Sequence, residues 1–309
     1  MFSIEVKSLT KKFGDFTSVN SISFDVEKGE IFGFLGANGA GKSTTIRMLC
    51  GILEPTSGDA IVGGNSVKTN TDAVKQNIGY MSQKFSLYND LTVGENIDFF
   101  GGVYGLDGKK FKQQKEWVLK IANLNGKENL ITASLPGGIK QRLALGTAVI
   151  HQPKIVFLDE PTSGVDPISR RSFWELINLL SEQGTTVFVT THYLEEAEFC
   201  NNLMLIDSGN IIAGGTPKEL KTKYLSQPIF EIESDDVVTA LEVLESQNFS
   251  SETSIFGNHI HVITNENFSG KEQIKTALSN KNITVKRIDE IVPTLEDVFV
   301  HLLSQKESK

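Results

Sequence analysis

Cysteine is nearly absent from this sequence: only Cys50 and Cys200 occur among its 309 residues. They lie far apart and belong to no CxxC or Cys/His grouping, so we expect two buried, reduced thiols rather than a disulfide or a metal site. Long apolar runs are missing too, and none approaches the roughly 20 residues of a membrane-spanning helix. The first residues lack the basic and apolar segments of a signal peptide. Any membrane role is therefore expected to come through a partner.

Basic residues are outnumbered by acidic ones. The chain has 30 Lys and Arg against 38 Asp and Glu, a formal net charge of −8. Binding to nucleic acid needs clustered positive charge, so no nucleic-acid partner is expected. The apolar fraction is 39%, and 27 glycines raise it toward the globular average. The composition and length together predict a packed core in one large and one small domain.

Up to about residue 223, short apolar strands alternate with helical segments. Strands are expected at residues 22–26, 31–35, 58–62, 78–81, 155–158 and 186–190. Helices are expected after Lys42, after the capping-box pair Thr92 and Glu95, and at residues 109–122 and 173–180. This alternation predicts an α/β domain with a largely parallel sheet over residues 1–223.

The pattern changes after residue 224. The sequence there predicts a strand at Phe230 and Ile232, a helix, a hairpin around Gly257, a second helix and a strand near Val285. A last helix is capped by Thr294 and Asp297. Strand, helix, hairpin, helix and strand predict a small α+β domain at residues 224–309, of ferredoxin-like type.

A glycine-rich segment with the P-loop pattern follows the strand at 31–35 and precedes a helix, the context that this motif requires. Its glycines let successive backbone N–H groups point at phosphate oxygens. Lys42 is then expected to reach the β- and γ-phosphates, and the Ser43 hydroxyl to bind Mg²⁺. The alternative is a glycine-rich turn that matches by chance. The expected nucleotide-binding residues here are Gly36, Ala37, Asn38, Gly39, Ala40, Gly41, Lys42, Ser43 and Thr44.

An apolar strand carries two neighbouring acids, Asp159 and Glu160, at its carboxyl end. Ligands bind at this edge of open parallel sheets. Asp159 is expected to hold Mg²⁺ through water, and Glu160 to polarise an attacking water as general base. Without the P-loop, a pair of solvated acids at a strand end would explain these residues equally well.

Together these segments resemble the ABC ATPase family over about residues 1–220. The resemblance implies a P-loop NTPase cassette with a mixed sheet and a helical subdomain at about 84–150. It places Gln83 near Mg²⁺ and the permease contact, Asp166 in the D-loop, and His192 as sensor of the γ-phosphate. Phe13 falls where the family has an aromatic residue that stacks on adenine; a core phenylalanine is the alternative.

The signature segment departs from the family pattern. Where most members read Leu-Ser-Gly-Gly-Gln, this chain has Pro136, Gly137 and Gly138 between Leu135 and Ile139. Proline removes the serine hydroxyl but fits the first turn of a helix. The lost hydrogen bond to the γ-phosphate of the opposite subunit is expected to weaken the closed dimer by about 1.5–3 kcal/mol.

The resemblance implies an ATPase that binds ATP and Mg²⁺, with Lys42, Glu160 and His192 as its catalytic residues. It implies two partners, a membrane permease and a second cassette in a homodimer or heterodimer, at the cytoplasmic face of the membrane. Residues 292–299 resemble the tail of the drug and antibiotic exporter branch, which implies a drug-like, antibiotic or lipid-like substrate. A soluble ABC ATPase acting on ribosomes or DNA, and a weakly hydrolysing regulatory cassette, are the alternatives.

Overall fold

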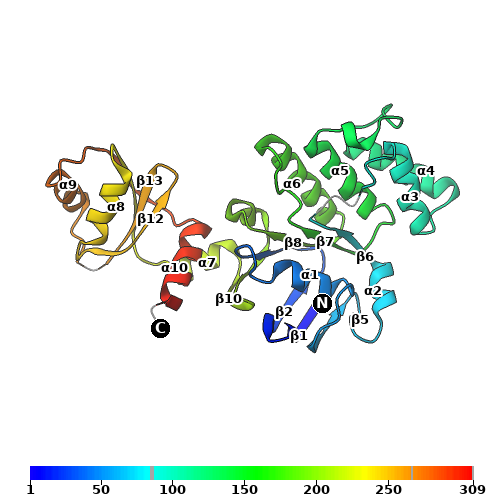
Figure 1. Cartoon of the computed structure of the whole chain (residues 1–309), viewed down its shortest axis with the longest axis horizontal. Helices are drawn as coiled ribbons and strands as arrows, with labels where there is room; N and C mark the ends of the chain where they lie inside the picture. Colours follow the sequence, from blue (N-terminus) through cyan, green and yellow to red (C-terminus); the bar gives the residue numbers. More distant parts are fainter. Residues whose placement is uncertain (84–86, 266, 308–309) are drawn as a thin grey trace. The chain divides into compact units, whose positions relative to one another are not determined.

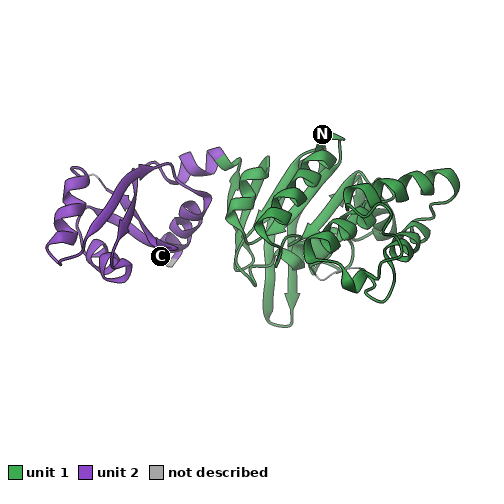
Figure 2. Ribbon diagram, turned by 90° about the horizontal axis from the view of Figure 1, so that it is seen from above, with its two compact units in different colours: residues 1–217 green, residues 218–309 purple. Residues whose placement is uncertain are grey.

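The computed structural model describes residues 1–83, 87–265 and 267–307. The chain separates into two compact units, residues Met1–Pro217 and Lys218–Lys309 (Figure 2). Helix α7 (Pro217–Tyr224) starts at this division and ends at the position where the sequence pattern changes.

Two sheets form the first unit (Figure 1). One is antiparallel with the order β2-β1-β4-β5. The other has the order β10-β9-β3-β8-β7-β6, and all its strands are parallel except the edge strand β10. The expected mixed sheet is thus confirmed. The strands are β1 (Phe2–Phe13), β2 (Phe16–Glu27), β3 (Ile31–Leu35), β4 (Ser57–Val62), β5 (Asn65–Ser66), β6 (Ile78–Met81), β7 (Ile155–Asp159), β8 (Thr186–Thr191), β9 (Asn202–Asp207) and β10 (Asn210–Gly215).

Stacked phenylalanines join the two sheets in one core. Phe24 of β2 lies 5.5 Å, centroid to centroid, from Phe32 of β3, and Phe188 of β8 lies 5.4 Å from Phe32 and 5.5 Å from Phe157 of β7. Rings at these separations add to the free energy gained by burying their area. The core therefore fixes β3, β7 and β8 side by side, and with them the loops that follow these strands.

Helices of the first unit connect the strands. Helices α3, α4 and α5 pack on one another at one end of the unit, away from β1 and β2 (Figure 1). The predicted capping box of α3 is confirmed, because Thr92 and Glu95 exchange hydrogen bonds with each other's backbone N–H. The first part of the expected helical subdomain, residues 84–86, lies outside the described residues. The helices are α1 (Lys42–Leu49), α2 (Thr71–Asn77), α3 (Val93–Val103), α4 (Gly108–Ile121), η1 (Thr132–Ser134), α5 (Gly137–Ala148), α6 (Pro167–Glu182) and η2 (Leu194–Phe199).

The second unit is an antiparallel sheet of order β12-β13-β11-β14 with a βαββαβ sequence of elements. This is the predicted ferredoxin-like arrangement. Its core includes Ile232, Ile260, Leu244 and Ile274. The elements are β11 (Ile229–Ser234), α8 (Val237–Glu245), β12 (Ser250–Phe256), β13 (His259–Thr264), α9 (Lys271–Ser279), β14 (Val285–Ile291) and α10 (Leu295–Glu307).

A buried ion pair attaches α10 to this sheet. Asp297 caps the helix through Thr294, as predicted, and its other carboxylate oxygen lies 2.7 Å from Nδ1 of His261 on β13. Burial alone would lower the pKa of His261, but Asp297 and Glu231 outweigh burial and raise it. Burial alone would raise the pKa of Asp297, but hydrogen bonds from His261 and Thr294 lower it. Both shifts favour the ionised pair.

We expect this pair to stabilise the second unit over a defined pH window. A raised histidine pKa gives stabilisation that is complete below about 6.5 and is lost as pH rises through the raised value. A lowered aspartate pKa gives stabilisation that is present above about 3.9 and is lost as pH falls through the lowered value. Breaking a buried pair costs about 3–5 kcal/mol. Asp297→Asn should therefore lower the free energy of unfolding near neutral pH.

Denaturant unfolding of the full chain, measured at about pH 6 and about pH 9, tests this expectation. The wild type should lose stability between these values by more than Asp297→Asn does. Asp289→Asn, which removes a partly exposed carboxylate of the same sheet, is the matched control. An equal pH dependence in wild type and Asp297→Asn would contradict the assigned role.

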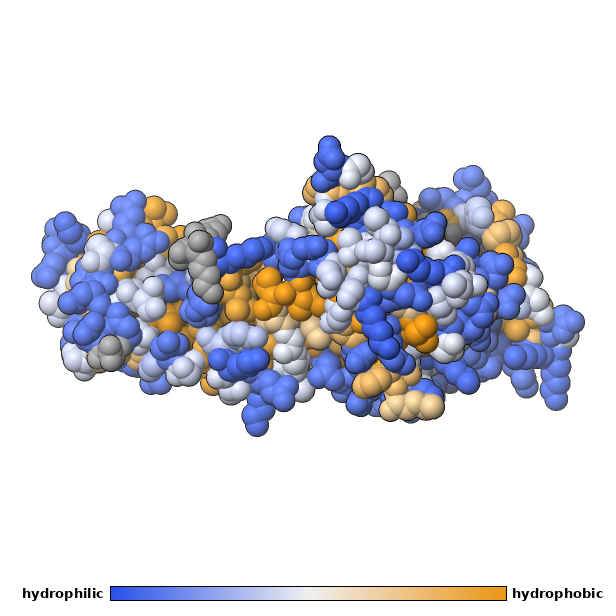
Figure 3. Space-filling model, turned by 90° about the horizontal axis from the view of Figure 1, so that it is seen from below, coloured by the Kyte–Doolittle hydropathy of each residue, from blue (hydrophilic) through white to orange (hydrophobic). Residues whose placement is uncertain are grey.

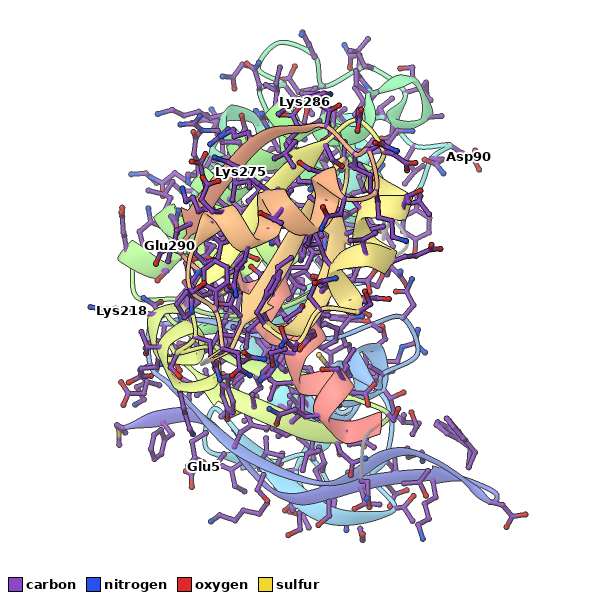
Figure 4. All side chains as sticks on the ribbon, turned by 90° about the vertical axis from the view of Figure 1, so that its left-hand side faces the viewer. Glu5, Asp90, Lys218, Lys275, Lys286 and Glu290 are labelled. Carbon is purple, nitrogen blue, oxygen red and sulfur yellow. The ribbon has the colours of Figure 1, made fainter. Side chains whose placement is uncertain are left out.

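Polar and apolar side chains share the surface, and the exposed large apolar ones include Phe13, Phe16 and Ile168. Hydrophilic residues predominate on the face shown in Figure 3. Among the described residues, no helix is both long enough and apolar enough to cross a bilayer. Cys50 and Cys200 are buried and unpaired, as expected. Of the six charged residues labelled in Figure 4, Glu5 is partly exposed, and the others are exposed: Asp90, Lys218, Lys275, Lys286 and Glu290.

Candidate active site

The glycine-rich loop, residues 36–41, connects β3 to α1. Its shape depends on glycine at two positions, because neighbouring backbone leaves no room for a side chain. A Cβ on Gly36 would lie 2.1 Å from the carbonyl oxygen of Ile206, and one on Gly41 would lie 2.6 Å from that of Ser18. Gly41 also has φ of 109°, a left-handed value that favours glycine. These contacts fix the loop at the N-terminus of α1, where backbone N–H groups lack helical partners.

Lys42, the first residue of α1, folds back over this loop. Its side chain is only 4% exposed. The ammonium group donates to the carbonyl oxygens of Gly36 at 2.8 Å and Ala37 at 3.2 Å, and it lies 3.1 Å from Oε1 of Glu160. A buried ammonium group needs such partners to offset its lost hydration. Lys42 is thus held at the loop by groups of the chain itself.

Asp159, the last residue of β7, meets the start of α1. Its Oδ1 accepts hydrogen bonds from the Ser43 hydroxyl at 3.0 Å and from the Thr190 hydroxyl at 2.7 Å. Burial raises the pKa of Asp159, and these two hydrogen bonds partly offset that rise. One hydroxyl and one carboxylate side by side fit Mg²⁺, which binds one or two protein oxygens together with waters and phosphates.

Glu160 is buried at 6% exposure and has φ of 47°, an uncommon value outside glycine. Its N–H donates to the carbonyl and the hydroxyl oxygens of Thr190, which fix this conformation. The carboxylate faces Lys42 on one side. On the other, Gln83 Nε2 donates to Oε2 at 3.0 Å, and His192 Nδ1 lies 3.2 Å from the same oxygen. Backbone strain held in this way is typical of functional sites.

The structure therefore brings together six of the residues expected from the sequence. They come from the ends of β6, β7 and β8 and from the start of α1, and the parallel strands end at one edge of the sheet. The six are Lys42, Ser43, Gln83, Asp159, Glu160 and His192.

Thr190 is a residue of this site that sequence reasoning missed. It is fully buried, pairs with Asp159 in the register of β7 and β8, and contacts both Asp159 and Glu160. The signal for it is weak, since threonine is common in strands. A hydroxyl at the carboxyl end of a strand next to β7 is the only indication in the sequence.

Three further residues are expected from the sequence to contact nucleotide. Phe13 ends β1 at a hairpin tip and is 50% exposed, so the alternative that it is a core residue is wrong. Thr44 shares a hydrogen bond with Ser18 of β2 at 2.9 Å. Asp166 is the N-cap of α6 and accepts from the N–H of Ser169. Hydrogen bonds with the side chain and the backbone N–H of Ser169 lower the pKa of its carboxyl group.

The signature residues begin α5, with one correction to the expectation. Pro136 does not lie in the first turn but is the N-cap, with φ of −57° and ψ of 150°. Its carbonyl accepts from the N–H of Ile139 and of Lys140, and no side chain caps the helix. The pattern missed this shift by one residue because proline suits both positions. Gly137 faces open space, whereas a Cβ on Gly138 would lie 2.5 Å from Ser169.

Two protein-family models match the sequence, one in each part of the chain. Residues 19–163 match the family model described as ABC transporter. Residues 215–303 match the model described as ATP-binding protein DrrA1-3-like, C-terminal domain.

Curated relatives are similar over the first unit or over the whole chain. The probable multidrug ABC transporter ATP-binding protein YbhF of Escherichia coli is 52% identical over 71% of this chain and 38% of its own length. The linearmycin resistance ATP-binding protein LnrL of Bacillus subtilis is 40% identical over 74% of each chain. The Nod factor export ATP-binding protein I of Rhizobium sp. is 34% identical over 99% of this chain and 98% of its own length. The chain thus spans well under half the length of YbhF.

Solved structures share the fold of the first unit. An ATP binding subunit of an ABC transporter is 26% identical, with a TM-score of 0.66 over 72% of this chain and 93% of that one. CbiO1 from Clostridium perfringens, part of an ABC transporter complex, gives the same identity and score over 71% and 90%. By its motifs, its fold and these relatives, the chain belongs to the ATP-binding subunits of ABC transporters.

Proposed function

We propose that this chain hydrolyses ATP to power a separate membrane permease, and that the permease exports its substrate. One observation carries the proposal: the Glu160 carboxylate, beside the P-loop, contacts the side chains of Lys42, Gln83 and His192. At the same edge of the sheet, the Ser43 hydroxyl donates a hydrogen bond to Asp159. A cation, a carboxylate and an imidazole at the end of a phosphate-binding loop are the groups that ATP hydrolysis needs.

We assign phosphate binding to the glycine-rich loop and to Lys42. Backbone N–H groups of residues 36–44 and the α1 N-terminus attract phosphate oxygens. Lys42 leaves the carbonyl oxygens of Gly36 and Ala37 and turns to the terminal phosphates. Ser43 and Asp159, with Gln83 nearby, would hold Mg²⁺, which neutralises phosphate charge when it is bound.

The turn of Lys42 also frees Glu160. In the structure the Glu160 carboxylate is engaged with the Lys42 ammonium group, 3.1 Å away. Once Lys42 faces phosphate, Glu160 can accept a hydrogen bond from the attacking water and act as general base. We assign His192, which lies beside the same carboxylate, as a hydrogen-bond donor to the γ-phosphate. ATP binding and activation of the base are thereby linked through one side chain.

The remaining site residues are assigned to adenine and to a second cassette. The exposed ring of Phe13 is suited to stack on adenine. Gly137 and Gly138, at the start of α5, and Asp166, at the start of α6, are assigned to the closed dimer. A solved relative, a dimeric ATP-binding cassette bound to ADP and Pi, is 25% identical with a TM-score of 0.63. The second cassette is another copy of this chain or a different cassette.

The proposal that the permease exports its substrate is inferred from the names of the curated relatives. Their names refer to multidrug transport, linearmycin resistance and Nod factor export. We therefore propose a drug-like, antibiotic or lipid-like substrate and a place on the cytoplasmic face of the membrane, bound to the permease. The excess of acidic residues, which gives a net charge of −8, disfavours the alternative of an ATPase acting on DNA or ribosomes.

The proposal predicts that a multi-span membrane protein is encoded beside this chain. The two proteins should co-purify, and ATP turnover should rise when they are reconstituted together in lipid vesicles. If turnover instead rises on adding ribosomes or DNA, and the membrane protein neither binds nor stimulates, the soluble alternative is correct.

Pro136→Ser is expected to tighten ATP-dependent dimerisation. Serine at the N-cap can accept from a helix N–H, which is worth about 1 kcal/mol. In the closed dimer its hydroxyl can also donate to the partner's γ-phosphate, a charge-assisted bond of about 1.5–3 kcal/mol. Dimer affinity with ATP, measured in the Glu160→Gln background, should therefore rise about 10-fold or more.

Pro136→Ala is the matched control, because it removes proline without adding a hydroxyl. The serine variant should dimerise more tightly than the alanine variant. Equal dimer affinities for serine, alanine and proline would show that Gly137, Gly138 and the helix N-terminus already hold the phosphate without help.

A further inference from the structure

A buried carboxylate outside the site, Glu196 of η2, joins two loops of the site. Its side chain is 2% exposed. Oε1 accepts a hydrogen bond from the Thr162 hydroxyl at 2.5 Å, and Oε2 accepts one from the Thr191 hydroxyl at 2.8 Å. Both threonines are themselves 1% exposed. Each carboxylate oxygen is therefore committed to a different loop.

These two loops carry the groups proposed for hydrolysis. Thr162 lies two residues after Glu160, and the intervening turn is closed by a hydrogen bond from the N–H of Ser163 to the Glu160 carbonyl oxygen. Thr191 directly precedes His192, and its hydroxyl also accepts from the N–H of Tyr193 at 3.0 Å. One carboxylate thus connects the backbone around the base with the backbone around the histidine.

A cation completes the cluster. The Nε atom of Arg170, on α6, lies 3.4 Å from Oε1 of Glu196. The guanidinium carbon lies 4.0 Å from the centre of the Tyr193 ring, and this ring lies 4.1 Å from the ring of His192. Arg170 therefore offsets the charge of Glu196 and packs on the residue that supports the histidine.

We propose that Glu196 is a positioning residue that sets the place of His192 relative to Glu160. The inference rests on the proposed function, because it concerns hydrolysis at that site. A buried ionic group is by itself a weak source of stability, and apolar residues of similar volume often replace one without loss. What a carboxylate offers here is two acceptors with a fixed spacing, one for each loop. It acts through Thr162, Thr191 and the adjacent Tyr193 ring and does not touch the reacting atoms.

Glu196→Gln tests this inference, since glutamine keeps the shape but can accept at only one of the two positions. We expect kcat for ATP to fall about 10- to 100-fold, the range that small misplacements of catalytic groups produce. The Kd for ATP should stay within about 2-fold of wild type, because the phosphate-binding loop is untouched.

A matched pair of substitutions separates positioning from packing. Thr191→Val removes the hydroxyl and keeps the volume, and should reproduce the loss of kcat. Thr191→Ser keeps the hydroxyl and should retain most of it. Glu175→Gln, at an exposed carboxylate of α6 whose partner is Arg171, is the control and should behave as wild type.

A double-mutant cycle with His192→Ala distinguishes positioning of His192 from a general structural role of Glu196. If Glu196 acts through His192, adding Glu196→Gln to His192→Ala should lower kcat by no more than about 2-fold. Fully additive losses would overturn the inference. Amide hydrogen exchange at residues 191–195 should also speed up in Glu196→Gln and not in Glu175→Gln, a result that does not depend on turnover.

Unchanged kcat together with unchanged exchange in Glu196→Gln would refute the positioning role and leave the proposed function intact. Faster exchange in Glu196→Gln, in a chain whose wild type has no ATP turnover, would support the positioning role and refute the proposed function.

Discussion

Replacing Glu160 with glutamine is expected to stop ATP hydrolysis while ATP binding continues. The amide keeps the size of the side chain but cannot accept the proton of the attacking water. Loss of a general base costs about 10²- to 10⁴-fold in rate. Binding should survive or improve, because Lys42 no longer has a buried carboxylate 3.1 Å away to hold it from the phosphates.

Steady-state turnover and nucleotide affinity of Glu160→Gln are measured on the same preparation. Glu175→Gln, an exposed change of the same kind on α6, should match wild type in both. Turnover of Glu160→Gln near the wild-type rate would remove this residue from the mechanism and make another group the base.

Lys42→Ala is expected to weaken ATP binding about 10- to 100-fold. It deletes the charged side chain proposed to face the terminal phosphates, and hydrogen bonds to charged groups are worth about 1.5–3 kcal/mol. The change also leaves the Glu160 carboxylate, buried at 6% exposure, without its cation. Some loss of stability is therefore expected as well.

Titration with a fluorescent ATP analogue measures the affinity, and thermal unfolding shows whether the variant is folded. Lys7→Ala, which removes an exposed lysine of β1, controls for loss of positive charge. A folded Lys42→Ala variant with wild-type affinity would mean that the lysine stays with Gly36, Ala37 and Glu160 when nucleotide is bound.

Much of the fold was predictable because its signals are local. Apolar runs gave the strands at 31–35 and 78–81, and the spacing of Thr92 and Glu95 gave the start of α3. The order of elements after residue 224 gave the ferredoxin-like unit. Each of these depends on residues close together in the sequence.

The site was predictable in its residue types and not in its contacts. Motifs identified Lys42 and Glu160, but the ion pair between them joins residues far apart in the chain, and no spacing indicates it. The left-handed backbone of Glu160 depends on Thr190 in a neighbouring strand. Pro136 was placed one residue too far into its helix, because proline suits the N-cap as well as the first turn.

A single-turnover experiment tests the central claim most directly, that this chain cleaves ATP through Glu160 after Lys42 has taken the phosphates. ATP labelled on its γ-phosphate is mixed with excess protein and Mg²⁺, and the bound label is followed over time. The account predicts that wild type converts the bound label to free phosphate and that Glu160→Gln retains it as intact ATP. Equal conversion by both proteins, or bound ATP that wild type never cleaves, would contradict the account.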